Sequence, residues 1–123
     1  MAGPRTVNYP HRGEVYLASL DPTLGAEILK THPALILQNN ITNRASPITI
    51  VAAITSQFEE PLYPTEVLVR PPEGGLQSES VVLLNQIRSI DKRRLIHRMG
   101  KLKPKTMEQV DRALLLSFGL VRV

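Results

Sequence analysis

With 123 residues, of which 42% are hydrophobic, the chain is long enough to bury the core of one compact domain and too short for two. Cysteine is absent, which excludes disulfide frameworks, thiol nucleophiles and thiolate metal sites. The sequence contains no apolar run of about 18 residues that would span a membrane, and residues 1–9 lack the apolar stretch of a secretory signal. We therefore expect a soluble cytoplasmic protein without membrane partners.

The positive charge is concentrated in one segment. The net charge is +4, and eight of the fifteen basic residues lie between Arg88 and Lys105, where Asp91 is the only acidic residue. Such a segment would attract nucleic acid or an acidic protein tail in a salt-dependent way. A basic run taken alone, however, is more often a solvated face.

The first third of the chain predicts two β-strands with a polar loop between them. Residues 13–20 have a β-rich composition, which predicts a strand, whereas residues 21–31 contain proline and glycine without periodicity, which predicts a loop. Residues 34–37 form a continuous apolar run that is typical of a buried strand. Residues 38–47 are polar and rich in turn formers.

The middle of the chain predicts three more strands. Residues 48–54 are apolar and β-branched, which indicates a second core strand, and the polar triplet 55–57 follows it. Residues 65–70 and 80–84 are separated by the Pro-Gly segment 71–75, a pattern typical of a hairpin.

The C-terminal region predicts one more strand and a helix. Residues 94–102 form a short predicted strand, and Thr106 and Gln109 have the spacing of a capping box. Apolar residues then recur at helical spacing, at Met107, Val110, Leu114, Phe118 and Val121. This pattern predicts an amphipathic helix that packs on the sheet. Short strands with one closing helix favour a mostly-β, α+β fold: a small, strongly bent antiparallel sheet or β-barrel.

Motifs for a metal or a cofactor are absent. The sequence has no H-E-x-x-H, no P-loop and no G-x-G-x-x-G, so we expect a function without cofactor or metal. A lone histidine is usually structural. His32 nevertheless stands out because it ends a polar loop immediately before a predicted core strand, where scaffolds present functional groups. Thr55 also follows a core strand, and its hydroxyl would either donate to a phosphate or, more commonly, cap a backbone group.

Six segments follow one another in an order and spacing that is specific as a set. They are RGEVY at residues 12–16, LDPTLGAE at 20–27, THPALILQN at 31–39, NRASP at 43–47, VAAITSQ at 51–57 and LLNQIRSIDKRRL at 83–95. On these segments the chain resembles the MazF/PemK family of toxin ribonucleases, and it is most similar to the Gram-positive type of MazF. The resemblance covers residues 12–123 as one toxin domain and leaves residues 1–11 as an N-terminal extension that is a candidate for disorder.

The resemblance implies a fold, an activity and partners. It implies an SH3-like barrel with a C-terminal helix that forms a homodimer, cleaves single-stranded RNA at short sequences without metal, and is inhibited by a MazE-type antitoxin. In the family, the ribose 2′-hydroxyl attacks the adjacent phosphate, which yields a 2′,3′-cyclic phosphate and a 5′-hydroxyl. This reaction needs a base for the 2′ proton, an acid for the leaving oxygen and donors for the developing charge.

The resemblance also assigns the catalytic positions. Thr55 corresponds to the family's catalytic threonine, whereas His32 takes the place of the catalytic arginine in the usual R-P-[AV] sequence. An arginine supplies a permanent charge and a bidentate fork, which neutral histidine does not. Imidazole, with a pKa of about 6.5, accepts and returns protons, as RNA cleavage requires. The substitution is thus compatible with an active enzyme, in which His32 is the base, or with an attenuated one.

The predicted RNA-binding residues are Glu27, Ser56, Gln57, Phe58, Asn85, Gln86 and Arg88. Glu27 matches the acid of a G-S-E pattern in which Ala26 replaces the serine, and Asn85 replaces the acid of an E-Q pair whose glutamine is retained as Gln86. The family's sequence preference is therefore not transferable. Two other functions stay open at this point: a catalytically impaired RNA-binding module, and a CcdB-like gyrase poison on the same architecture.

Overall fold

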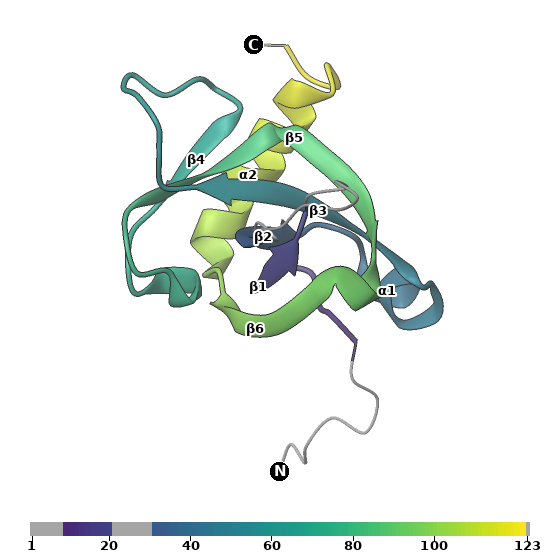
Figure 1. The fold of residues 1–123 in the computed structure, drawn as a ribbon. Helices are drawn as coiled ribbons and strands as arrows, with labels where there is room; N and C mark the ends of the chain where they lie inside the picture. The colour runs from purple at the N-terminus through teal and green to yellow at the C-terminus, as the bar shows by residue number, and fades with distance from the viewer. Residues whose placement is uncertain (1–8, 21–30, 123) are drawn as a thin grey trace.

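The computed structural model describes residues 9–20 and 31–122. Residues 1–8 of the predicted N-terminal extension and residues 21–30 of the predicted loop, including Glu27, lie outside the described residues. The elements of the described residues are β1 Glu14–Ser19, β2 Thr31–Ile36, α1 Asn40–Ala45, β3 Ile48–Thr55, β4 Glu66–Val69, η1 Glu73–Gly75, β5 Ser80–Asp91, η2 Lys92–Arg94, β6 Leu95–Lys101 and α2 Pro104–Ser117 (Figure 1).

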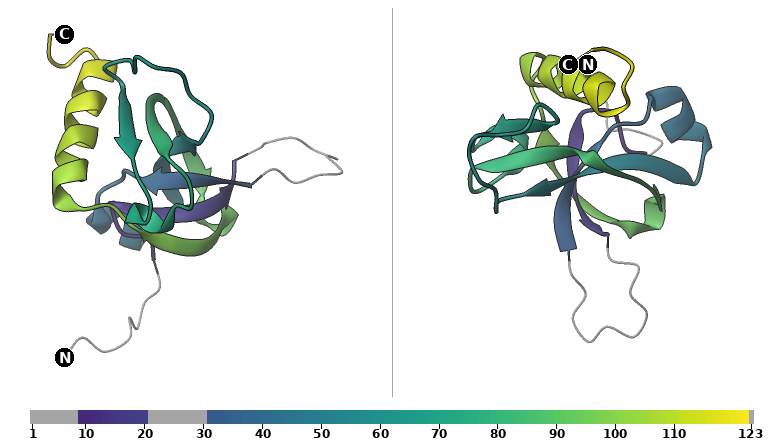
Figure 2. Two further views of the ribbon diagram at one scale, coloured as in Figure 1. Left: turned by 90° about the vertical axis from the view of Figure 1, so that its left-hand side faces the viewer. Right: turned by 90° about the horizontal axis from the view of Figure 1, so that it is seen from above.

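The strands form one antiparallel sheet with the order β4-β5-β3-β2-β1-β6. Its strong bend and the helix α2 on one side are visible in Figures 1 and 2. The predicted mostly-β, α+β class with a C-terminal helix is confirmed. Closure into a barrel is not, because β4 and β6 do not pair with each other in the described part of the chain.

The η1 turn packs against β6 where a closed barrel would have strand pairing. A Cβ added to Gly100 in β6 would lie 2.6 Å from the carbonyl carbon of Gly74 in η1, and one added to Gly75 would lie 2.1 Å from the carbonyl oxygen of Met99. Real Cβ contacts are never this short. The connection between β4 and β5 therefore bridges the two edges of the sheet by close backbone packing at glycines.

Both faces of the sheet are buried. The face under α2 packs the larger cluster, which includes Val15, Leu35, Ile54, Leu84, Val110 and Ala113. The opposite face, inside the bend, packs Tyr16, Ala18, Leu20, Ala34, Ile36, Val51 and Ile90. Among the described residues, no helix is both long and apolar enough to cross a membrane.

Two predictions about helices are wrong. Helix α2 has Lys103 as its N-cap residue and no side-chain cap, so Thr106 and Gln109 lie inside the helix rather than in a capping box. The helix ends at Ser117, which leaves Phe118 beyond it with 58% of its surface exposed.

The turn-rich region after β2 contains the short helix α1. The Asn39 side chain caps its first turn by accepting a hydrogen bond from the Thr42 N–H.

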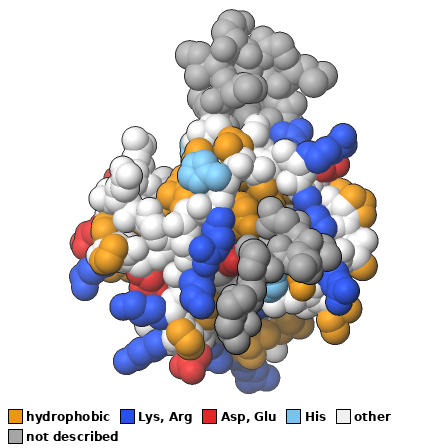
Figure 3. Space-filling view, turned by 90° about the horizontal axis from the view of Figure 1, so that it is seen from below, with side chains coloured by type: hydrophobic (Ala, Val, Ile, Leu, Met, Phe, Trp, Pro, Cys, Tyr) orange, Lys and Arg blue, Asp and Glu red, His pale blue; other side chains and the backbone are white. Residues whose placement is uncertain are grey.

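Several side chains of the basic segment anchor β6 and η2 to the rest of the fold. Arg98 pairs with the buried Glu14 at 2.8 Å, and Arg94 donates to the Ser19 carbonyl at 3.2 Å. A side-chain hydrogen bond from Arg93 lowers the pKa of Asp91 to about 2. On the face seen in Figure 3, Lys and Arg side chains alternate with apolar and acidic ones and form no continuous basic patch. Much of this segment is therefore structural.

Candidate active site

The register of β2 and β3 brings His32 and Thr55 to one place. Ala34 and Ala53 form the last pair of the antiparallel β2–β3 ladder, and His32 and Thr55 each lie two residues beyond that pair on their own strand. Because side chains alternate along a strand, both point to the same face as the two alanines. Pro33 has no N–H with which to extend the ladder past Ala34. The two residues assigned from the family resemblance thus lie on one face of the sheet, just past the end of the β2–β3 ladder.

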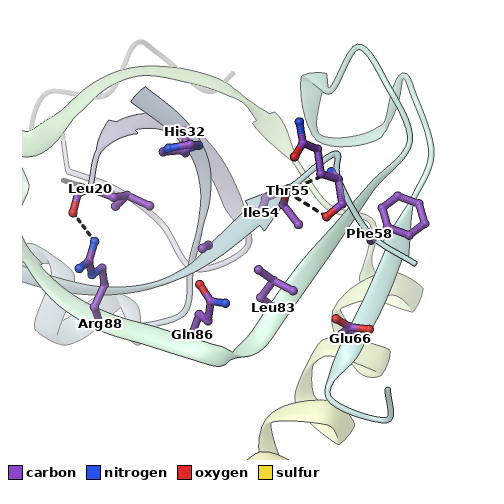
Figure 4. Close-up of a pocket in the computed structure, with 11 residues that line it drawn as sticks. Leu20, His32, Ile54, Thr55, Phe58, Glu66, Leu83, Gln86 and Arg88 are labelled. Carbon is purple, nitrogen blue, oxygen red and sulfur yellow. Dashed lines mark hydrogen bonds between the residues drawn. The ribbon is translucent and has the colours of Figure 1, made fainter. Parts of the chain in front are cut away.

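A cavity of about 640 Å³ opens beside this pair (Figure 4). Its lining comes from the residue after β1, from the strands β2 to β5 and from the segment after β3. The lining residues are Leu20, His32, Ala53, Ile54, Thr55, Gln57, Phe58, Glu66, Leu83, Gln86 and Arg88. A second hollow of about 400 Å³ adjoins it, shares His32, Thr55 and Gln57, and adds Ser56. We refer to the first as the main cavity. Together the two hollows form an open site with His32 and Thr55 between them.

An irregularity in β5 positions Gln86. On β3, the neighbours Ala52 and Ala53 pair with Ile87 and Leu83, so residues 84–86 bulge out of the ladder between these partners. Gln86 lines the main cavity, as predicted, whereas the exposed Asn85 is absent from its lining. The prediction of Asn85 as an RNA-binding residue therefore receives no support from the shape of the site.

The Thr55 hydroxyl closes a turn and also lies in the main cavity. Its oxygen accepts a hydrogen bond from the Gln57 N–H at 3.0 Å and lies 3.3 Å from the Gln57 carbonyl oxygen, to which it donates. The first contact uses one lone pair, and the second is long enough to be exchanged for a phosphate oxygen. Capping and phosphate binding are thus both compatible with its position.

Two further groups add basic character to the main cavity. The His32 side chain is exposed and forms no hydrogen bond with any described residue, so both ring nitrogens are available to a substrate. Arg88 donates one N–H to the Leu20 carbonyl, which leaves the rest of its guanidinium fork facing the cavity (Figure 4). A fork of this kind is suited to phosphate oxygens.

Charged groups of the site are few. Of the described residues that line the main cavity, Glu66 is the one carboxylate and Arg88 the one permanent cation. In the described ranges, no three His, Asp or Glu side chains gather in a way that would hold a metal ion. The site therefore offers acid-base chemistry, hydrogen-bond donors and one guanidinium to a substrate.

Comparisons with known proteins show the family to which the chain belongs. The model of a family described as "PemK-like, MazF-like toxin of type II toxin-antitoxin system" matches residues 11–118. The protein "Endoribonuclease EndoA" of Bacillus subtilis (strain 168) is 44% identical over 110 residues, which are 89% of this chain and 95% of that protein. The matched span includes both strands that carry His32 and Thr55.

Solved structures give the same result for the fold. A mycobacterial endoribonuclease in complex with its cognate antitoxin superposes with a TM-score of 0.77 at 27% identity, covering 93% of this chain and 99% of that one. A MazE-MazF complex from Deinococcus radiodurans gives a TM-score of 0.76 at 26% identity, with 91% and 97% covered. Both similar structures contain an antitoxin.

Proposed function

Because the chain belongs to the PemK-like, MazF-like toxin family of type II toxin-antitoxin systems, we propose that it is an endoribonuclease that cleaves single-stranded RNA in the main cavity. The family predicted from the sequence is confirmed, and its relative in Bacillus subtilis is named an endoribonuclease. The observation that carries the proposed site is that His32 and Thr55, from the neighbouring strands β2 and β3, both line this cavity.

The proposed chemistry assigns a role to each polar group. The His32 imidazole takes the proton of the 2′-hydroxyl, whose oxygen forms a bond to phosphorus as the bond from phosphorus to the 5′ oxygen breaks. The 5′ oxygen leaves with a proton returned by the imidazolium. Thr55 and Arg88 donate hydrogen bonds to the non-bridging oxygens, where charge accumulates in the transition state. The products are a 2′,3′-cyclic phosphate and a 5′-hydroxyl.

The proposed activity is tested with the purified chain and a long RNA in the presence of EDTA. We expect cuts at a short recurring sequence, with a 5′-hydroxyl and a cyclic phosphate at the new ends. Intact RNA after incubation with the wild-type chain, His32→Arg and Thr55→Ala alike would contradict the ribonuclease assignment. The gyrase poison and the inactive RNA-binding module are not favoured, since the relative that covers 89% of the chain is named an endoribonuclease.

We also propose that the chain forms a homodimer and binds a MazE-type antitoxin. The antitoxin is supported by the complexes of similar toxins. The dimer is supported by apolar side chains left exposed near the end of α2, where Leu115, Phe118 and Leu120 have 38%, 58% and 68% of their surface exposed. A closed SH3-like barrel and a cytoplasmic location stay predictions.

The dimer has a direct test by light scattering. We expect a mass near twice 13.7 kDa for the wild-type chain and a shift toward the monomer for Phe118→Asp, because a charge would be buried in the interface. Arg112→Asp, in the helix that precedes Phe118 and with an exposed polar side chain, is the matched control and should stay dimeric. A wild-type chain that is monomeric at high concentration would refute this part of the proposal.

A further inference from the structure

A carboxylate faces the cavity in which RNA is proposed to bind. In the sheet, Glu66 of β4 pairs with Leu83 of β5, and Leu83 pairs with Ala53 of β3. These three side chains form a row on one face, and Thr55 lies two residues along β3 on that same face. Glu66 therefore belongs to the floor of the main cavity, with Phe58 at the same end (Figure 4).

The position of this carboxylate is fixed by its own turn. Oε1 of Glu66 accepts a hydrogen bond from the Tyr63 N–H at 2.9 Å, and the Glu66 N–H donates to the Tyr63 carbonyl at 2.9 Å. Oε2 accepts no hydrogen bond from any described residue. The side chain is thus held in place with one oxygen available, which reduces the entropy lost when a ligand binds.

The chemistry of this end of the cavity fits a nucleobase rather than a phosphate. A carboxylate repels phosphate oxygens, whereas it accepts well from the amino groups of bases. The Phe58 ring and the Leu83 side chain offer an apolar surface next to it, and aromatic rings bind unstacked bases of single-stranded RNA by stacking. The cation Arg88 lines the same cavity at the other end (Figure 4).

We propose that Phe58, Leu83 and Glu66 form a subsite that selects a base with an exocyclic amino group beside the scissile phosphate. Adenine, cytosine and guanine carry such a group, and Oε2 of Glu66 accepts one of its N–H bonds. Uracil has a carbonyl oxygen where cytosine has its amino group, and the carboxylate repels that oxygen. This inference rests on the proposed ribonuclease function and specifies one determinant of its sequence preference.

Glu66→Gln tests the subsite with little change to the fold, because the amide oxygen still accepts from the Tyr63 N–H while the charge is removed. Glu59→Gln is the matched control. Glu59 lies between β3 and β4, and its exposed carboxylate does not line the main cavity. All cuts in a pool of randomised oligonucleotides are mapped for the wild-type chain and both variants. Single substrates then compare adenosine, cytidine or guanosine at the preferred position with analogues that lack only the amino group.

We expect the wild-type chain and Glu59→Gln to cleave the amino-bearing substrate at least about tenfold faster than its analogue, since a hydrogen bond to a charged group is worth this much or more. Glu66→Gln should reduce this ratio to within about threefold. An unchanged ratio in Glu66→Gln, or an equal loss of rate on every substrate, would overturn the subsite alone. If the wild-type chain cuts no RNA, the proposed function fails and the subsite with it.

Discussion

Replacing His32 with alanine is expected to lower the cleavage rate about a hundredfold or more, because the proposed base for the 2′ proton is then lost. The rate is measured under single-turnover conditions with saturating RNA, so that chemistry rather than binding is observed. The melting temperature should not change, since the exposed His32 side chain forms no hydrogen bond with the described residues. His97→Ala is the matched control: His97 is also exposed on a strand but does not line the main cavity, so cleavage should be unaffected.

The pH dependence of the rate separates a base from a simple cation. A rate that depends on a neutral imidazole base rises with pH between about 5 and 8, because imidazole changes its charge in this range. His32→Arg replaces the base with a permanent cation and should remove that rise. If His32→Arg is much faster than the wild-type chain while His32→Ala matches it, the general-base role is wrong and His32 marks an attenuated site.

Much of the fold was predictable because the strands bury both faces. Continuous apolar runs such as residues 34–37 and 48–54 are typical of such strands. The first run lies in β2 except for residue 37, which follows the strand, and the second lies entirely in β3. The candidate pair His32 and Thr55 was also identified, from polar residues beside core strands and from the family resemblance. That both side chains reach one cavity depends on the pairing and register of β2 and β3, which the sequence does not specify.

The remaining features depend on contacts between distant parts of the chain. Strand β5 continues past the bulge at residues 84–86 to Asp91, well beyond the predicted end at residue 84. The bulge is the reason that Gln86 reaches the cavity while Asn85 does not. No local sequence pattern predicts this bulge. Glu66 was missed for a similar reason. It begins a short strand that does not pair directly with the strand of Thr55, and only the pairing of β4 with β5 and of β5 with β3 places it at the site. The prediction for Glu27 is not tested, because it lies outside the described residues.

Thr55→Val is expected to lower the cleavage rate by a similar factor, about a hundredfold or more, because valine keeps the branched shape but removes the donor to the phosphate. Thr55→Ser is the matched control and should retain most of the activity, since the hydroxyl is kept. Loss of the Thr55 oxygen also leaves the Gln57 N–H without its acceptor. Substrate binding must therefore be measured with the rate: a structural effect of the turn alone would weaken binding to RNA, whereas loss of a transition-state donor lowers the rate at saturation.

The double variant His32→Ala, Thr55→Val distinguishes a catalytic pair from two independent residues. If the imidazole and the hydroxyl act on the same phosphate in one step, the effects of removing them are not additive. Removing one group from a variant that already lacks the other should then lower the cleavage rate by a much smaller factor than removing it from the wild-type chain. Independent roles would multiply the two losses instead. Since His32 and Thr55 line one cavity from neighbouring strands, we expect the double variant to be nearly as active as the slower single variant.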